Sequence, residues 1–222
     1  MKKIELVIFD LDGLLVDSEK HMWGRNMKIL GDELGYKYDT KWHQSLMGSA
    51  HDSFRRSCLN FYGNDFPFDT YFQKLIELNE KSIDNKEIPL MSGAIEILEY
   101  LKNNNIKYTL ATSTKIDLAK KMLSSCGIDK YFNIITTGDE VNKGKPAPDI
   151  YNVAVSKFDV PKENVLVLED GHVGFTAAYN AGLDCVIVED FAILQDFDRQ
   201  NAYKVVHNLK EVITLIENST TL

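Results

Sequence analysis

The sequence predicts an α/β protein: a doubly wound, parallel, Rossmann-like sheet with an all-helical cap inserted after the first strand. Two observations support this prediction. From residue 90 onward, short apolar segments alternate with helical ones, which indicates a parallel sheet with helices on both faces. Residues 19–88 instead have a helical pattern, many aromatic residues and no convincing buried strand. We therefore expect residues 1–16 plus 90–222 to form the Rossmann-like core and residues 17–89 to form the cap.

Each element of the core follows from a local pattern. Ile4–Phe9 is a continuous apolar run with β-branched residues, which is typical of a buried parallel strand. Later strands are expected at four similar segments, "KYTLAT", "NIITT", "NVLVLE" and "CVIVE". Helices are expected to begin at Ser92–Gly93 and to span Lys115–Cys126, Asp149–Phe158, Val173–Ala181 and Leu209–Asn218, with Gly127 and Gly182 ending two of them.

Composition narrows the class of protein. The chain has 222 residues, 44% of them hydrophobic and 26% charged, which is enough for a sizeable core. Its net charge of -8 disfavours nucleic acid or an anionic membrane as a partner. The three cysteines are scattered, which fits a reducing compartment, and no apolar stretch approaches the roughly 18 residues of a membrane span. We expect a cytoplasmic protein.

Polar side chains follow four of the predicted strands. Because ligands of an open parallel sheet bind at the carboxyl ends of its strands, these side chains should converge on one edge. Each group alone has a plainer explanation: an aspartate pair can form an Asx-turn, a hydroxyl cluster can cap a helix, and a lysine can be exposed. The groups are Asp10 and Asp12, then Thr112, Ser113 and Thr114, then Lys143 and Lys145, and finally Glu169 and Asp170.

Together these groups predict a particular chemistry. Four carboxylates in one cleft would repel one another unless a cation lay among them. Oxygen ligands without a nearby histidine or cysteine favour Mg²⁺. Hydroxyls, a lysine and the amides at a helix N-terminus can hold a dianion beside this ion. The combination is typical of a phosphoryl-transfer site.

Four motifs resemble those of the haloacid dehalogenase superfamily, in the same order along nearly the whole chain: "FDLDGLLVDSE", "LATST", "GKPAPD" and "LEDGHVG". The likeness is closest to the branch with a helical cap after the first strand. That branch includes sugar-phosphate phosphatases, pseudouridine 5'-phosphatase and β-phosphoglucomutase. The second acid of the first motif is present, which favours attack on phosphorus over the carbon chemistry of the dehalogenases proper.

The resemblance implies a role for each matching residue. Asp10 corresponds to the nucleophile, which forms an aspartyl-phosphate and also binds the metal. Asp12 corresponds to the general acid/base, and its backbone carbonyl is expected to bind Mg²⁺. Thr112 matches the hydroxyl that binds the transferring phosphoryl group, and Ser113 adds a backbone N–H. Lys145 resembles the lysine that neutralises the nucleophile and the phosphoryl oxygens.

The last motif supplies the remaining metal ligands. Asp170 is similar to the direct acidic ligand, and Glu169 to an outer ligand that acts through water. We prefer Lys145 to Lys143 for the motif lysine because Lys145 directly precedes Pro-Ala-Pro-Asp.

The cap departs from the mutases of this family. β-Phosphoglucomutases carry a histidine where this chain has Met22, and His21 is one residue early, a rotation of about 100° on a helix. They also carry an arginine three residues after a glycine, where this chain has His51 after Gly48. Gly48, His51 and His21 remain candidate substrate contacts. For each histidine the alternative is a surface or partly buried side chain without a catalytic part.

We expect a Mg²⁺-dependent phosphatase that acts on a small phosphorylated metabolite, either a sugar phosphate or a nucleoside monophosphate. A β-phosphoglucomutase-type mutase is the first alternative. The second is a phospho-acceptor receiver domain, a class that is usually shorter, lacks such a cap and carries its acceptor aspartate on a later strand. The cap should move about hinges near Asp17–Glu19 and Pro89–Ser92. A monomer is expected because the cap already covers the site.

Overall fold

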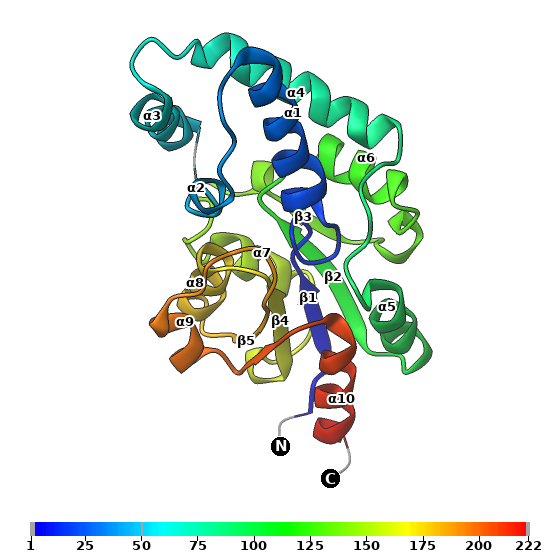
Figure 1. Cartoon of the computed structure of the whole chain (residues 1–222). Helices are drawn as coiled ribbons and strands as arrows, with labels where there is room; N and C mark the ends of the chain where they lie inside the picture. Colours follow the sequence, from blue (N-terminus) through cyan, green and yellow to red (C-terminus); the bar gives the residue numbers. More distant parts are fainter. Residues whose placement is uncertain (1–2, 50, 221–222) are drawn as a thin grey trace.

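Within the described residues, 3–49 and 51–220 of the computed structural model, six parallel strands form one sheet (Figure 1). They are β1 (Leu6–Phe9), β2 (Lys107–Thr112), β3 (Ile135–Thr137), β4 (Val165–Glu169), β5 (Asp184–Val188) and β6 (Lys204–Val206). Their order is β3-β2-β1-β4-β5-β6, with β1 in the middle, where Ile8 is aligned with Thr109 and Val167. The predicted doubly wound α/β fold is confirmed.

Alternate residues of β1 face two separate hydrophobic layers. Val7 and Phe9 pack toward α5 (Ala94–Asn103), α6 (Ile116–Ser125) and α10 (Leu209–Thr220). Leu6 and Ile8 pack toward α7 (Asp149–Ser156) and α8 (His172–Asn180) on the opposite face (Figure 1). Burial on both faces explains why this strand is apolar throughout. None of the described helices combines the length and apolarity needed to cross a membrane.

Two elements of the core were not predicted from the sequence. α9 (Asp196–Asn201) is short and mostly polar, and β6 has three residues, of which only Val206 is buried. Elements of this length are too short to show a hydrophobic period. Single helical turns complete the connections: η2 (Asp129–Tyr131), η3 (Gly138–Glu140) and η4 (Lys162–Asn164).

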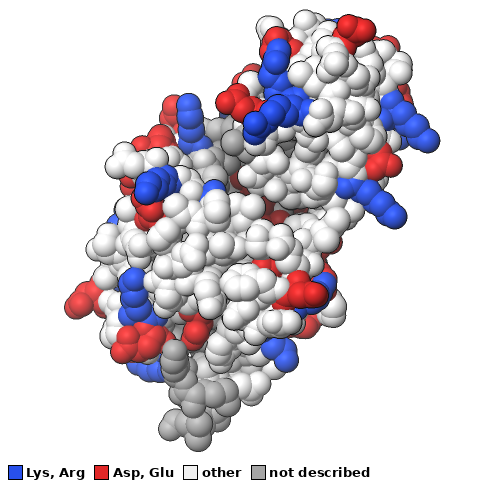
Figure 2. Space-filling view, turned by 90° about the vertical axis from the view of Figure 1, so that its left-hand side faces the viewer, with Lys and Arg blue, Asp and Glu red and all other residues white. Residues whose placement is uncertain are grey.

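The cap consists of helices that lie over the carboxyl ends of the strands (Figure 1). They are η1 (Glu19–Gly24), a π-helical turn, followed by α1 (Arg25–Leu34), α2 (Thr40–Gln44), α3 (His51–Tyr62) and α4 (Phe68–Asp84). Most of the cap's aromatic residues form its hydrophobic core, with Phe68 and Tyr71 almost completely buried, whereas Phe61 is exposed. Figure 2 shows cap and core as two lobes with positive and negative side chains interspersed on this face.

The two connections between the lobes run side by side. Val16 and Leu90 form an isolated antiparallel bridge. The backbone N–H of Asp17 donates to the carbonyl of Pro89, and that of Met91 donates to the carbonyl of Leu15, each at 2.9 Å. Both segments expected to act as hinges take part in this short ribbon, Asp17 from the first and Pro89 to Met91 from the second.

Candidate active site

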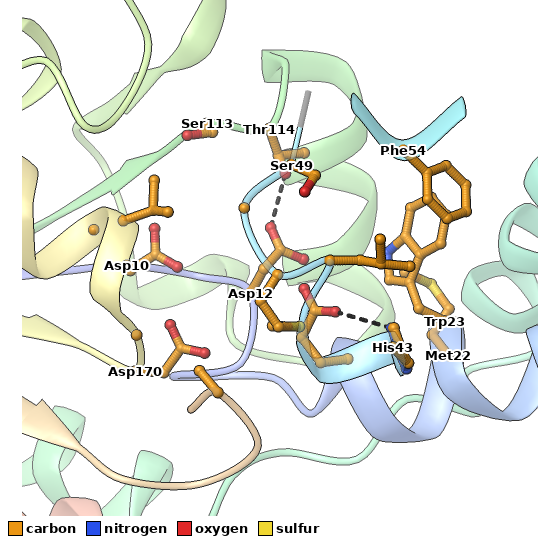
Figure 3. A pocket seen from close by; sticks show the side chains of 18 of the residues that line it. Asp10, Asp12, Met22, Trp23, His43, Ser49, Phe54, Ser113, Thr114 and Asp170 are labelled. Atoms are coloured by element: carbon orange, nitrogen blue, oxygen red, sulfur yellow. Dashed lines mark hydrogen bonds and ion pairs between the residues drawn. The ribbon is translucent and has the colours of Figure 1, made fainter. Parts of the chain in front are cut away.

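The register of β1 and β4 brings three carboxylates together. Phe9 is aligned with Leu168, so the residues that follow them, Asp10 and Glu169, are neighbours, and Asp170 comes next. All three are buried, with exposed fractions of 6%, 2% and 8% respectively. One oxygen from each lies within 4.8 Å of the others. The ends of β1 and β4, far apart in sequence, therefore form one acidic cluster at the carboxyl edge of the sheet, of which Figure 3 shows Asp10 and Asp170.

This cluster has the donors that a hard divalent cation requires. Burial, with the neighbouring charges of Glu169 and Asp10, raises the pKa of Asp170 well above its usual value. A bound cation would remove this repulsion, and carboxylate oxygens are the ligands that Mg²⁺ prefers. The residues present therefore fit a Mg²⁺ site.

Lys145 joins the nucleophile candidate to the acidic cluster. Its Nζ lies 2.5 Å from Oδ1 of Asp10, 2.6 Å from Oε1 of Glu169 and 3.2 Å from the carbonyl oxygen of Ala111. Burial lowers the pKa of Lys145, but Asp10 and Glu169 outweigh this effect, so the pKa is raised and the ammonium stays charged. Lys143 is exposed. The sequence did not identify the Tyr151 hydroxyl, which also donates to Glu169.

Asp12 has a different environment from Asp10, although only Leu11 separates them. The Ser18 hydroxyl donates to its Oδ1 at 2.9 Å, and the Thr114 hydroxyl donates to its Oδ2 at 2.7 Å. Burial, followed by the charge of Asp10, raises the pKa of Asp12, which suits a group that must carry a proton. Sequence reasoning assigned no role to Ser18 or Thr114, because nothing local marks them as partners of Asp12.

Gly13 makes room for the acidic cluster. Its φ of +79° belongs to the left-handed region, and a Cβ atom there would lie 2.2 Å from Oδ2 of Asp170. A side chain at this position would therefore be strained and would also displace a proposed metal ligand.

The hydroxyl loop after β2 faces the same cavity. Thr112 is almost completely buried, and its Oγ1 accepts the backbone N–H of Thr114 at 3.1 Å. Thr112, Ser113 and Thr114 all line the cavity, so the expected phosphoryl-binding groups are brought to the acidic cluster.

The cavity lies between the lobes and has a volume of about 680 Å³. Asp10 and Asp170 lie on its core side, while Trp23, Met22 and Phe54 of the cap lie across from them (Figure 3). Its lining includes two of the three substrate contacts expected in the cap, Gly48 and His51. The third, His21, is outside the described lining: its side chain is 58% exposed, and Nδ1 lies 2.8 Å from Oδ2 of Asp17.

Comparison with known proteins decides the family. A family model described as haloacid dehalogenase-like hydrolase matches residues 7–188. The chain belongs to this family. A phosphorylated carbohydrates phosphatase from Thermotoga maritima is 29% identical to this family member over 214 residues, which cover 96% of the chain and 91% of the relative.

Two further relatives of this haloacid dehalogenase-like hydrolase show the range of the family. The β-phosphoglucomutase of Bacillus subtilis is 30% identical over 190 residues, 82% of each protein. A crystal structure of CbbY from Rhodobacter sphaeroides in complex with phosphate superposes with a TM-score of 0.75 at 25% identity, covering 94% of this chain and 96% of that one. Since the relatives include a phosphatase and a mutase, the reaction must be argued from the site.

Proposed function

We propose that the protein is a Mg²⁺-dependent phosphatase that hydrolyses small phosphorylated metabolites through an aspartyl-phosphate on Asp10. The observation that carries this proposal is the contact of Lys145 with Asp10 and Glu169 inside the acidic cluster. It pairs a carboxylate oxygen with a fixed positive charge at an edge where a dianion must be bound. The phosphatase activity named for the Thermotoga maritima relative supports it.

The proposed reaction has two displacements. An Asp10 carboxylate oxygen attacks phosphorus, the bond from phosphorus to the ester oxygen breaks, and Asp12 gives its proton to the departing alkoxide. A water molecule then attacks the phosphorus of the aspartyl-phosphate, Asp12 accepts a proton from it, and inorganic phosphate leaves as Asp10 is regenerated. Splitting one difficult displacement into two in this way is the advantage of covalent catalysis.

The chain's own groups stabilise the charge that develops. The Lys145 ammonium neutralises the nucleophile and the phosphoryl oxygens, and the Thr112 hydroxyl and the Ser113 N–H are proposed to bind the same oxygens. Asp10, the carbonyl of Asp12 and Asp170 would hold Mg²⁺, with Glu169 acting through water. When bound, the cation neutralises negative charge on the phosphoryl group. We further propose that the protein acts as a cytoplasmic monomer.

The mutase alternative has the same first displacement but transfers the phosphoryl group to a different acceptor. It requires a sugar hydroxyl, rather than water, to take the phosphoryl group from Asp10. Met22 lines the cavity at the position where the mutases carry a histidine, and this favours hydrolysis. A mutase would convert a sugar 1-phosphate into the 6-phosphate and release little inorganic phosphate.

Phosphate release measured over a panel of sugar phosphates, nucleoside monophosphates and an aryl phosphate, with and without Mg²⁺, tests the proposal. We expect Mg²⁺-dependent release that Asp10→Asn abolishes, because the amide is not a nucleophile. Lys145→Ala should lower the rate by about two orders of magnitude or more, as loss of a preorganised charge does. Lys143→Ala is the matched control and should keep wild-type activity. No release from any compound, or full activity of Asp10→Asn, would refute the proposal.

A further inference from the structure

The cap side of the cavity carries little positive charge. Among the described lining residues, Lys145 is the only lysine or arginine, and it belongs to the core, where it is already held by Asp10 and Glu169. The charged cap residues in the lining are two acids, Glu19 and Glu80, beside apolar side chains such as Trp23 and Phe54. A phosphate group placed on this side would lose its hydration without gaining a cationic partner.

Asn79, a residue of the cavity lining on this side, has a hydrogen-bond donor that no described residue uses. It lies on α4, is 4% exposed and lines the cavity. Its Oδ1 accepts from Nδ2 of Asn26 at 2.8 Å, and Nδ2 of Asn26 is also 2.9 Å from the Ser82 hydroxyl. Nδ2 of Asn79, in contrast, has no hydrogen-bond partner among the described residues. A buried donor without a partner destabilises the protein, and a ligand that accepts its hydrogen bond would recover that free energy.

Glu19 is a second polar group on the cap side. It lies on η1, and Oε2 is 3.9 Å from Nε2 of His43, whose Nδ1 is 2.9 Å from the Tyr38 hydroxyl. Burial, then the charges of Asp12, Asp10 and Asp17, raises the pKa of Glu19 to about 8.

His43 does not add a positive charge to this group. Burial lowers its pKa to about 4, so the ring is neutral at neutral pH. His43 lies on the cap side, next to Met22 and Trp23 and away from Asp10 (Figure 3). His51, the other cap histidine in the lining, is half exposed, and its Nδ1 is 3.4 Å from Oδ1 of Asp52. The polar groups buried here therefore suit neutral hydroxyls rather than an anion.

We propose that Asn79 and Glu19 form a leaving-group subsite that binds hydroxyls of an uncharged leaving group, so that the enzyme accepts monophosphates and rejects substrates with a second phosphate at the far end. This inference rests on the proposed phosphatase function and names its substrate class. The Asn79 amide donates to a substrate oxygen, and the Glu19 carboxyl pairs with a substrate hydroxyl. A second phosphate would find no lysine or arginine among the described cap residues of the lining and would lose its hydration there without a cationic partner.

The test uses hydrolysis of an aryl phosphate as a readout that is independent of this subsite. Two matched pairs of compounds are added as inhibitors or competing substrates. They are glucose 6-phosphate with glucose 1,6-bisphosphate, and fructose 6-phosphate with fructose 1,6-bisphosphate. We expect the monophosphate of each pair to compete at least about tenfold more strongly, a difference of about 1.4 kcal/mol. The inference would be overturned if the monophosphate and the bisphosphate competed equally in both pairs, or if the bisphosphates competed more strongly. It would also be overturned if none of the four compounds competed at millimolar concentration. Absence of aryl phosphate hydrolysis would instead refute the proposed function.

Two sets of variants locate the effect. Asn79→Ala and Glu19→Ala should raise the ratio of the sugar-phosphate KM to the aryl-phosphate KM by about fivefold or more, since each loses a hydrogen bond to the leaving group. Ile76→Lys adds a cation to the cavity lining without touching Asn79, and should make the bisphosphates compete at least about tenfold better. Glu77→Lys, on the exposed face of α4, is its control and should leave competition unchanged. Unchanged KM ratios, or an Ile76→Lys variant that still rejects bisphosphates, would contradict the subsite.

Discussion

At the scale of single residues, the two aspartates of the first motif have been given opposite surroundings. Asp10 is paired with the ammonium of Lys145, whereas Asp12 receives hydrogen bonds from the neutral hydroxyls of Ser18 and Thr114. Environments that separate the protonation of two nearby carboxyls are how one site obtains both a nucleophile and an acid. Burial and the charge of Asp10 raise the pKa of Asp12, whereas the hydrogen bond from Thr114, in a loop distant in sequence, lowers it and holds the carboxyl in one orientation.

Replacing Thr114 tests whether this hydrogen bond positions Asp12. Thr114→Val keeps the shape of the side chain and removes the donor. We expect kcat to fall by about tenfold to a hundredfold, part of the 10²–10⁴ that a general acid contributes. Thr114→Ser restores the hydroxyl and should recover most of the rate. A valine variant with wild-type kcat in a phosphate-release assay would show that Asp12 does not depend on Thr114.

Gly13 and Gly35 form a natural pair for a second test. Their φ values are +79° and +78°, but a Cβ at Gly13 would meet Asp170, whereas no described atom lies within 4 Å of a Cβ at Gly35. Both alanine variants should lose about 1–2 kcal/mol of unfolding free energy through backbone strain. Gly13→Ala alone should also weaken Mg²⁺ binding, measured as the Mg²⁺ concentration for half-maximal activity. Equal Mg²⁺ requirements in the two variants would contradict the role of Asp170 as a ligand.

At the scale of elements, the position of the cap on the core also depends on contacts outside the paired connections. Nε2 of Gln44 donates to the carbonyl of Phe191 at 2.9 Å, and Nζ of Lys20 is 2.7 Å from Oδ1 of Asp190. The ion pair is partly exposed and contributes little by itself, about 0–1 kcal/mol. Close packing of the loop after α2 on α8 provides the sharper constraint.

A double-mutant cycle on Gly48 and Val173 tests this packing. A Cβ at Gly48 would lie 2.7 Å from Cγ2 of Val173. Gly48→Ala should therefore hold the cap away from α8 and raise the substrate KM several-fold, by about 1 kcal/mol of binding energy. Val173→Ala in the same chain should recover part of that loss, because the clashing methyl groups are gone. Strictly additive effects on KM would show that the two residues do not meet when substrate is bound.

At the scale of the whole molecule, the acidic cluster links folding stability to metal. Three buried carboxylates destabilise the metal-free protein, so Mg²⁺ should raise its melting temperature. At a Mg²⁺ concentration a hundred times the Kd, the unfolding free energy should increase by about 2.7 kcal/mol. Asp170→Asn should be more stable than wild type without Mg²⁺ and should respond little to its addition. Differential scanning calorimetry measures both effects. An identical Mg²⁺ response in the variant would place the cation elsewhere.

Much of this architecture could be predicted from the sequence. The continuous apolar run before Asp10 and the alternation of elements after residue 90 indicated a parallel sheet, and a parallel sheet brings its carboxyl ends to one edge. The predicted helices consequently end within two residues of the observed ones. The convergence of Asp10, Thr112, Lys145 and Asp170 follows from that topology together with the four motifs.

The remainder could not be predicted, for physical reasons. β6 and α9 are too short to show a hydrophobic period. The contact of Thr114 with Asp12 spans 102 positions, and the free amide of Asn79 depends on how α4 packs against α1. Such contacts depend on tertiary packing, which local propensity does not encode. His21 illustrates the same point, since one residue on a helix decides whether a side chain reaches the cavity.

The ribbon formed by Val16 and Leu90 has a consequence for how such a protein can be altered. The polypeptide leaves and rejoins the sheet layer at two adjacent points, so the segment between them can be exchanged for another insert whose ends are equally close, provided that Ser18 is kept on Asp12. Such a chimera should keep the proposed phosphoryl-transfer groups of the core and acquire a new choice of alcohol.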